Sequence, residues 1–342
     1  MAAPGTADAV PATLHASTQE SRETMTTTTA PPAVTAKGLR KSYGKHLVLD
    51  GIDLTVAEGS VFALLGPNGA GKTTTVQILS TLIGADGGEV RVAGHDVASA
   101  PDAVRAAIGV TGQFSAVDGL LTGRENLHLM ADLHHLPRRE GRVRAQELLA
   151  KFDLVEAAGK MAATYSGGMR RRLDLAMGLV GDPRIVFLDE PTTGLDPRSR
   201  RAMWQTIRGL VADGVTIFLT TQYLEEADQL ADQIAVLDHG TLVAQGTAAE
   251  LKRLIPGGHI SLQFADAAAL AAAARVLDGS TFDEDELTLQ VPSDGSVLLL
   301  RGLLDRLDSA AITVEALSVH TPDLDDVFLA LTGHSQEVEA SR

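Results

Sequence analysis

The sequence predicts an α/β protein in which a larger domain, built on a mixed and largely parallel sheet, precedes a smaller α+β domain. From Val34 to about Ile255, helical segments alternate with apolar runs. Polar and apolar residues do not strictly alternate within these runs, as expected for strands buried on both faces. Pro256-Gly257-Gly258 then interrupts this pattern, and shorter strands and helices follow. A length of 342 residues suits two domains of ordinary size.

Composition excludes several classes of protein. With 44% hydrophobic residues the chain can bury a core, and its net charge of −15 disfavours electrostatic capture of nucleic acid or anionic lipid. The chain has no cysteine, which excludes a disulfide scaffold, cysteine-ligated metal and thiol catalysis and is compatible with a cytosolic location. No apolar run is long enough to span a bilayer.

We expect the two ends of the chain to be disordered tails. Residues 1–33 are rich in Ala, Thr and Pro and show neither helical nor strand periodicity, and residues 336–342 form a short polar end. The predicted domains are therefore residues 34–255 and residues 256–335.

A glycine-rich segment carries the strongest functional signal. The strand Val61–Leu65 runs into Gly-Pro-Asn-Gly-Ala-Gly-Lys-Thr at positions 66–73, and a helix follows, which is the context of a phosphate-binding loop. Glycines let backbone N–H groups point at phosphate oxygens, and the helix N-terminus adds a positive end. Lys72 is expected to reach the β- and γ-phosphates, and the Thr73 hydroxyl to ligate Mg²⁺. The predicted nucleotide-binding residues here are Gly66, Pro67, Asn68, Gly69, Ala70, Gly71, Lys72, Thr73 and Thr74.

An acidic pair supplies the second half of the expected site. The apolar residues Ile185–Leu188 form a buried strand that ends in Asp189 and Glu190, at the edge where parallel sheets bind ligands. Asp189 is expected to hold Mg²⁺ through a water molecule, and Glu190 to act as general base toward the attacking water or to position it. Taken alone, such a pair could equally face solvent. Its combination with the phosphate loop favours a nucleoside triphosphate hydrolase.

A third motif indicates which family of hydrolases the chain resembles. Ser166-Gly167-Gly168 opens a helical stretch and lies 23 residues before Asp189. With the two motifs above, this arrangement resembles the ATP-binding cassette (ABC) family, which implies a P-loop nucleotide-binding domain with a mixed sheet, helices and a helical subdomain. In that family the Ser-Gly-Gly turn closes over the γ-phosphate of ATP bound to the opposite subunit, so the resemblance implies a homodimer with ATP at its interface. Taken alone, the motif reads as a Ser N-cap before two glycines.

Three further positions match the family's pattern one by one. Tyr43 lies where the family stacks an aromatic ring on adenine, and otherwise reads as a strand-end aromatic. Gln113 matches the glutamine that contacts Mg²⁺ and the attacking water and links the site to the membrane partner; the alternative is a surface-loop glutamine. Asp196 matches the loop that crosses to the other subunit, and it also suits the N-cap of a helix beginning at Pro197.

One position departs from the family's pattern. Gln222 lies in the segment 220–228, Thr-Thr-Gln-Tyr-Leu-Glu-Glu-Ala-Asp, where most members carry histidine. A glutamine amide can donate a hydrogen bond to the γ-phosphate as neutral imidazole does, yet it cannot become cationic near pH 7, so proton-coupled roles are excluded for this residue. Because Glu190 is retained, we expect hydrolysis to survive, with Glu190, Gln222 and Gln113 as the catalytic residues.

The C-terminal segment predicts a β-α-β-β-α-β order, which is compatible with a small ferredoxin-like domain. We expect a last helix, Leu324–Leu331, to pack back onto this domain. The single cassette, the Gln222 segment and the ending Thr321-Pro-Asp-Leu-Asp-Asp-Val-Phe together resemble the ATP-binding subunits of bacterial daunorubicin- and doxorubicin-resistance exporters. The resemblance covers residues 34–335.

This resemblance implies an ATPase that uses ATP and Mg²⁺ and drives export of a hydrophobic drug through a separate integral-membrane permease. The chain would then be a peripheral subunit on the cytoplasmic side of the cell membrane. The drug would contact the permease, and no nucleic acid would be bound. Three alternatives stay open: an ABC ATPase associated with nucleic acid or ribosomes, an exporter of lipid, glycan or another antibiotic, and a regulatory nucleotide-binding module without turnover, which rests only on the Gln222 departure.

Two other residue groups invite functional interpretations. The run Arg170–Arg172 after the Ser-Gly-Gly motif could attract phosphate, but a solvated or partner-facing helix edge is the simpler interpretation. His128 and His135 lie seven residues apart and could share a helical face with His134 nearby, yet no neighbouring carboxylate completes a metal-binding spacing. We therefore expect no metal other than Mg²⁺.

Overall fold

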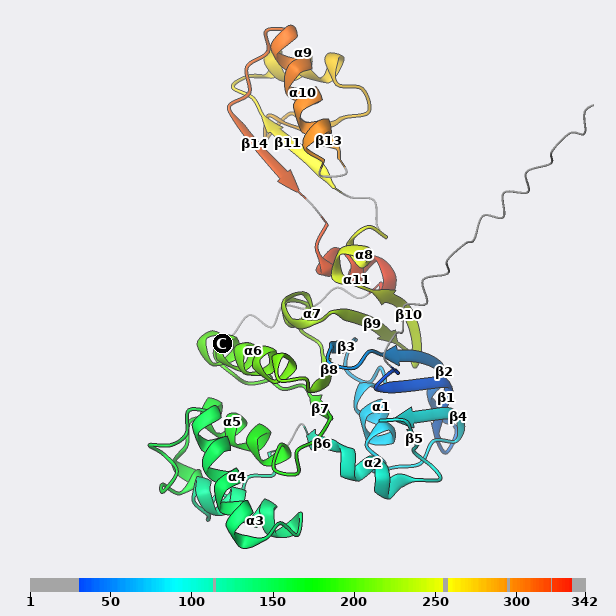
Figure 1. The fold of residues 1–342 in the computed structure, drawn as a ribbon. Coiled ribbons are helices and arrows are strands. Elements are labelled where there is room, and N and C mark those ends of the chain that lie inside the picture. The colour runs from blue at the N-terminus through cyan, green and yellow to red at the C-terminus, as the bar shows by residue number, and fades with distance from the viewer. Residues whose placement is uncertain (1–30, 113–114, 255–257, 294–295, 321, 334–342) are drawn as a thin grey trace, which may run out of the picture. The chain divides into compact units, whose positions relative to one another are not determined.

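The computed structural model describes residues 31–112, 115–254, 258–293, 296–320 and 322–333. Nearly all of the expected tail 1–33 and all of the tail 336–342 lie outside the described residues. Within the described ranges the strands form three sheets (Figure 1). No helix in these ranges is long and apolar enough to cross a lipid bilayer.

The largest sheet consists of β3 (Val61–Leu65), β6 (Ile108–Thr111), β7 (Ile185–Asp189), β8 (Thr216–Thr221), β9 (Gln233–Asp238) and β10 (Thr241–Gly246). Its order is β10-β9-β3-β8-β7-β6, and only the pair β9–β10 is antiparallel. This confirms the predicted mixed, largely parallel sheet. Every residue of β3, β7 and β8 is buried, because other elements cover both faces. The carboxyl ends of these three strands meet at one edge.

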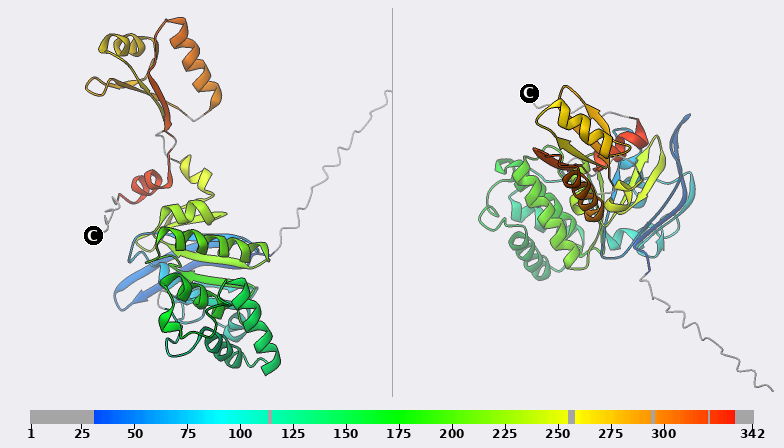
Figure 2. Two further views of the ribbon diagram at one scale, coloured as in Figure 1. Left: turned by 90° about the vertical axis from the view of Figure 1, so that its left-hand side faces the viewer. Right: turned by 90° about the horizontal axis from the view of Figure 1, so that it is seen from above.

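The helices around this sheet are α1 (Lys72–Leu79), α2 (Pro101–Ala107), α3 (Gly123–Leu133), α4 (Arg138–Lys151), α5 (Gly167–Gly178), α6 (Pro197–Ala212), α7 (Leu224–Leu230) and α8 (Ala248–Lys252), with a short 3₁₀ helix at Ala162–Thr164. α3, α4 and α5 pack together as a helical group, drawn in green tones in Figures 1 and 2. α3 begins at a capping box, in which the side chains of Thr122 and Glu125 each accept a hydrogen bond from the other residue's backbone N–H. The predicted helical subdomain is therefore present.

A second sheet consists of β1 (Val34–Tyr43), β2 (His46–Val56), β4 (Gly87–Val92) and β5 (His95–Asp96). These strands pair antiparallel in the order β2-β1-β4-β5. The sequence patterns described above predict neither β4 nor β5. The core shared with the largest sheet includes the stacked rings of Phe62 and Phe218, whose centroids are 5.3 Å apart. We call residues 31–254 the large domain.

The small domain comprises the described residues between 258 and 320, namely β11 (His259–Gln263), α9 (Ala267–Val276), β12 (Thr281–Asp283), β13 (Thr288–Pro292), α10 (Val297–Ser309) and β14 (Ala316–His320). The β-α-β-β-α-β order is the predicted one, and the strands pair antiparallel as β12-β13-β11-β14. Ile260, Leu262 and Leu289 form one core with Leu270 of α9 and Leu303 of α10. Both helices therefore cover the same face of this sheet.

The last helix, α11 (Leu324–Thr332), corrects one expectation. Its residues Leu324, Val327 and Phe328 belong to the core of the large domain, and the helix contacts α8, α7 and β10 (Figures 1 and 2). The prediction that this helix packs onto the small domain is therefore wrong. An apolar stripe shows that a helix buries a face, but it does not identify the surface on which that face packs. The boundaries 34–255 and 256–335 stay a prediction.

Candidate nucleotide-binding site

The glycine-rich segment joins the end of β3 to the start of α1. A Cβ atom added at Gly66 would lie 2.3 Å from the backbone oxygen of Leu237, and one at Gly71 would lie 2.6 Å from a methyl carbon of Leu49. Gly71 also has a φ of 111°, in the region that favours glycine. Glycine is therefore required at both positions, and the backbone itself lines the resulting turn.

Lys72 is the first residue of α1, and its buried ammonium group lies within this turn. Its Nζ donates hydrogen bonds to the backbone oxygens of Gly66, at 2.8 Å, and Pro67, at 3.1 Å. The same atom lies 3.5 Å from Oε1 of Glu190, which follows β7. Burial lowers the pKa of Lys72, and the Glu190 carboxylate opposes this effect. The lysine and the predicted general base are thus brought together.

The acidic pair is held by a residue that the motifs do not indicate. The Thr220 hydroxyl, on β8, donates a hydrogen bond to Oδ1 of Asp189 and accepts one of 3.1 Å from the backbone N–H of Glu190. Glu190 has a φ of 48°, and a non-glycine residue in this conformation costs about 1 kcal/mol or more. The Thr193 hydroxyl donates to Oε2 of Glu190 at 3.3 Å. Neighbouring groups therefore hold both the backbone and the side chain of Glu190.

A cavity of about 360 Å³ connects the loop to Glu190. It is lined by Val48, Asn68, Gly69, Gly71, Lys72, Thr73, Thr74 and Glu190. Tyr43, the expected adenine contact, does not belong to this lining. This residue is 51% exposed, and Nζ of Lys41 lies over its ring, 5.6 Å from the centroid. The cavity therefore unites the phosphate-binding loop with the predicted base, while Tyr43 lies outside its lining.

The oxygen donors at this edge suit Mg²⁺. The Thr73 side chain is in the cavity lining, and Asp189 ends the buried strand beside Glu190. Among the described residues, no group of three or more His, Cys, Asp or Glu side chains is placed to hold a metal ion. Mg²⁺ bound with a nucleotide needs no such cage, because one or two protein oxygens, phosphates and water complete its coordination.

The Ser-Gly-Gly motif and the Asp196 loop lie close together in space within one subunit. Ser166 caps α5 by accepting a 3.2 Å hydrogen bond from the N–H of Met169, and Asp196 caps α6 by accepting from Arg198 and Ser199. Both N-cap interpretations are therefore confirmed. A Cβ atom at Gly168 would lie 2.9 Å from the Ser199 hydroxyl oxygen, so the two helix starts approach closely. Whether these groups also reach a second subunit stays a prediction.

The two predicted catalytic glutamines differ in what the structure describes. Gln222 is half-buried and is the first residue after β8, the strand that carries Thr220. It therefore begins the segment that leads from the acidic edge into α7. Gln113 lies outside the described residues, although the structure describes Gly112 before it.

The three arginines after Gly168 do not form one solvated edge. Arg171 is half-buried, with a side chain that is only 11% exposed and paired with Asp174 at 3.2 Å. Arg170 and Arg172 donate to the backbone oxygens of Ala162 and Phe152. The simpler interpretation of the run is therefore wrong for Arg171. Sequence spacing alone cannot show which of three adjacent arginines faces inward.

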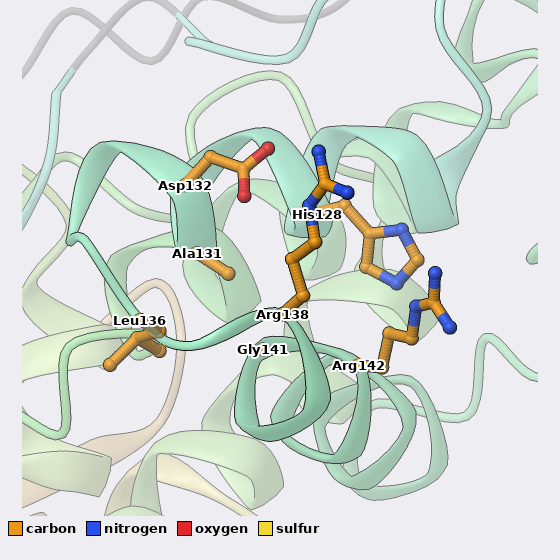
Figure 3. A pocket seen from close by; sticks show the side chains of 7 residues that line it. All are labelled: His128, Ala131, Asp132, Leu136, Arg138, Gly141 and Arg142. Atoms are coloured by element: carbon orange, nitrogen blue, oxygen red, sulfur yellow. The ribbon is translucent and has the colours of Figure 1, made fainter.

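A second pocket lies in the helical group (Figure 3). It has a volume of about 120 Å³ and is lined by His128, Ala131, Asp132, Leu136, Arg138, Gly141 and Arg142. The labelled guanidinium groups of Arg138 and Arg142 lie near the His128 ring, so the local charge disfavours a metal cation. Neither His134 nor His135 is in the lining.

Comparison with known proteins identifies the family. The model of the ABC transporter family matches residues 49–193. A daunorubicin resistance ATP-binding protein of Streptomyces coeruleorubidus is 50% identical over 91% of this chain and 99% of its own. The daunorubicin/doxorubicin resistance ATP-binding protein of Streptomyces peucetius is 48% identical over 88% of this chain and 93% of its own. A doxorubicin resistance ATP-binding protein of Mycobacterium tuberculosis is 46% identical over the same shares.

Solved structures that resemble this chain also include ATP-binding subunits and cassettes of ABC transporters. An ATP-binding subunit of an ABC transporter superposes with a TM-score of 0.59 and 28% identity, over 65% of this chain and 92% of the other. A dimeric ATP-binding cassette in a post-hydrolysis state, bound to ADP and Pi, superposes with a TM-score of 0.57 and 27% identity, over 63% of this chain and 98% of the other. The chain therefore belongs to the ABC transporter family, among the daunorubicin- and doxorubicin-resistance ATP-binding subunits, as its motifs predict.

Proposed function

We propose that this chain binds and hydrolyses ATP as one of two identical subunits and drives export of a hydrophobic, anthracycline-like drug through a separate integral-membrane permease. Membership of the ABC family supports ATP binding and hydrolysis coupled to transport. The names of relatives with 46–50% identity, which refer to daunorubicin or doxorubicin resistance, support the class of cargo.

The observation that carries the proposal is the approach of Lys72 to Glu190 across the cavity of the phosphate-binding loop. The ammonium group and the carboxylate are 3.5 Å apart, with exposed side-chain fractions of 5% and 10%. When ATP binds, the loop amides and Lys72 are expected to hold its phosphates, and Glu190 to orient the attacking water and accept its proton. Gln222 is expected to donate a hydrogen bond to the γ-phosphate.

Thr73 and Asp189 are the residues that would hold Mg²⁺, together with Gln113 as the family resemblance implies. The ion would neutralise charge on the phosphate oxygens when bound. The Thr220 hydroxyl keeps the Asp189 carboxylate oriented at the end of β7.

Two features support a homodimer with ATP at its interface. Ser166 and Gly167 are exposed at the start of α5, and the described lining of the loop cavity includes neither of them. A site that uses these groups therefore needs a second copy, and the structural neighbour with ADP and Pi is dimeric. The chain would act at the cytoplasmic side of the membrane, held there by its permease, and the drug would contact that permease.

An ATPase measurement tests the first half of the proposal. We expect the chain, reconstituted with its permease, to release phosphate from MgATP, and Glu190→Gln to lower kcat about 100-fold or more with ATP binding retained. Lys72→Ala is expected to lose ATP binding itself. Glu225→Gln, an exposed acid on α7, is the matched control and should keep wild-type turnover. Unchanged turnover in Glu190→Gln would remove the general-base assignment.

A transport measurement tests the cargo. Inside-out vesicles with the complex should accumulate daunorubicin when ATP is added, and vesicles with Glu190→Gln should not. A second candidate cargo is a Nod factor, because the Nod factor export ATP-binding protein I of Ralstonia nicotianae is 42% identical over 64% of this chain and 68% of its own. ATP turnover without daunorubicin uptake would reject the drug assignment, and turnover independent of any membrane partner would favour an ABC ATPase outside transport.

A further inference from the structure

Arg171, on α5, joins the helical group to the backbone around Glu190. Its Nε donates to the backbone oxygen of Pro191 at 2.9 Å, and its Nη2 lies 3.1 Å from the backbone oxygen of Asp189 and 3.4 Å from that of Glu190. One planar guanidinium group thus contacts three consecutive carbonyl groups. Glu190, the middle residue, is the one with the left-handed φ of 48°.

The same guanidinium also reaches β6. Its Nη1 donates to the backbone oxygen of Gly112 at 2.8 Å and pairs with Oδ2 of Asp174 at 3.2 Å. The other oxygen of Asp174 accepts a 3.0 Å hydrogen bond from the backbone N–H of Ala116. The pair therefore fixes Gly112 and Ala116, on either side of Gln113 in the sequence, to the residues that follow β7.

Asp174 is buried and the Arg171 side chain is mostly covered, so the charge of each residue depends on the other. The side chains of Arg171 and Asp174 are 11% and 3% exposed. Burial raises the pKa of Asp174 and lowers that of Arg171, and each partner opposes the effect on the other. Removing either charge would leave the other buried without compensation, which is more costly than losing a surface ion pair.

We propose that Arg171 and Asp174 are a positioning pair that holds the strained Glu190 backbone and sets its carboxylate for ATP hydrolysis. The proposal rests on the proposed function and adds residues that the three sequence motifs do not contain. Arg171 is suited to this task because its five donors have a fixed planar geometry, whereas a lysine ammonium cannot contact four carbonyl groups and a carboxylate at once. Arg171 lies on the helix that begins with the Ser-Gly-Gly motif, so it links that motif to the general base.

Kinetics with a neighbouring control test the pair. We expect Arg171→Lys to lower kcat roughly 100-fold, because a misplaced base loses that much, with KM for ATP changed less than about threefold. Arg172→Lys is the matched control: Arg172 follows on the same helix and contacts Phe152 and Asp153. It should keep wild-type kcat. Asp174→Asn should lower kcat in the same direction as Arg171→Lys. Because the two residues act together, the fold reduction of kcat in the double variant should be no more than about twice the reduction in the worse single variant.

Hydrogen exchange separates the pair from the proposed ATPase activity. In full-length protein, the peptide containing the Ala116 amide should exchange faster in Arg171→Lys and in Asp174→Asn, and at the wild-type rate in Arg172→Lys. Equal kcat and equal exchange rates in Arg171→Lys and Arg172→Lys would overturn the proposal that Arg171 and Asp174 position Glu190. If the wild-type complex hydrolyses no ATP, the proposed function fails, and the exchange rates still decide whether the pair holds this backbone. A loss of kcat with proportional loss of ATP binding and of thermal stability would show a purely structural role and reject positioning.

Discussion

The indole N–H of Trp204, on α6, donates a 3.0 Å hydrogen bond to Oε1 of Glu226 on α7. Glu226 is fully buried, four residues after Gln222, so this bond joins the helix that Asp196 caps to the helix that follows β8. Burial raises the pKa of Glu226, and neighbouring hydroxyl groups, the indole and Arg200 oppose this only in part. The folded protein therefore favours the protonated form of Glu226 more than the unfolded chain does.

The raised pKa predicts how Glu226→Gln changes stability with pH. At pH values between the ordinary glutamate pKa of 4.5 and the higher pKa of Glu226 in the folded protein, the folded protein binds more protons at this site than the unfolded chain, so wild-type stability falls as pH rises. Glutamine keeps the acceptor for Trp204 but has no proton to lose. We expect the free energy of unfolding of Glu226→Gln, relative to wild type, to rise from pH 5 upward by at most about 1.4 kcal/mol per pH unit.

Urea unfolding between pH 5 and pH 8 measures this difference. Glu225→Gln is the control, because Glu225 precedes Glu226 on the same helix and is exposed, 3.8 Å from Arg200. Its stability difference from wild type should change little across this range. A constant difference between Glu226→Gln and wild type would mean that Glu226 titrates alike in the folded and unfolded chain.

The sequence reveals the parts of the site that are contiguous. Four of its residues lie in short motifs of adjacent residues, and the structure places them at strand ends and helix starts as such motifs require, namely Gly66, Lys72, Asp189 and Ser166. Alternating helices and buried strands likewise predict the largest sheet. Local periodicity suffices where both faces of a strand are covered.

Tertiary contacts are what the sequence does not reveal. Thr220 lies 31 residues from Asp189, and Arg171 lies 59 residues from Gly112, so no spacing rule pairs them. The strand β5 has two residues and exists only because β4 offers it a partner. α11 has a readable apolar stripe, but the partner of that stripe depends on the path of the chain after the small domain.

The Thr220 hydroxyl is predicted to support activity more than stability. Thr220→Val keeps the shape of the side chain but removes the bond to Asp189 and one of the two acceptors of the Glu190 N–H, leaving the Thr220 backbone oxygen at 3.2 Å. We therefore expect Asp189 to lose orientation and Glu190 to be held less tightly. Because lost outer-shell hydrogen bonds typically reduce activity or metal affinity 10–100-fold, we expect kcat or the affinity for Mg²⁺ to fall by about that factor. Steady-state ATPase assays at varied Mg²⁺ concentration measure both quantities.

Thr216→Val is the control for this prediction. Thr216 is a buried threonine at the opposite end of β8, and its hydroxyl accepts a 2.9 Å hydrogen bond from the N–H of Gly59. Its loss should cost about 1 kcal/mol of stability and leave kcat unchanged. Equal kinetic effects of the two variants would show that Thr220 matters only as a buried polar group.

Position 222 offers a test of pH dependence. Gln222→His introduces a group that titrates near pH 6.5, where the wild-type amide does not titrate. If residue 222 faces the γ-phosphate, the kcat profile of Gln222→His should gain an inflection between about pH 6 and 7.5 that wild type lacks. Gln222→Ala is the control: it should lower kcat without adding that inflection. Profiles of one shape for wild type and Gln222→His would place residue 222 away from the reacting phosphate.

The buried face of α11 predicts that the stability of the large domain depends on this helix. Phe328 is 3% exposed and packs in the core of the large domain, so Phe328→Ala should lower stability by about 3–5 kcal/mol. Because α11 contacts α8, hydrogen exchange should accelerate in α8 and remain at the wild-type rate in α9 of the small domain. Leu329→Ala, at a neighbouring position that is 41% exposed, should change neither rate. Faster exchange in α9 with α8 unchanged would instead attach this helix to the small domain.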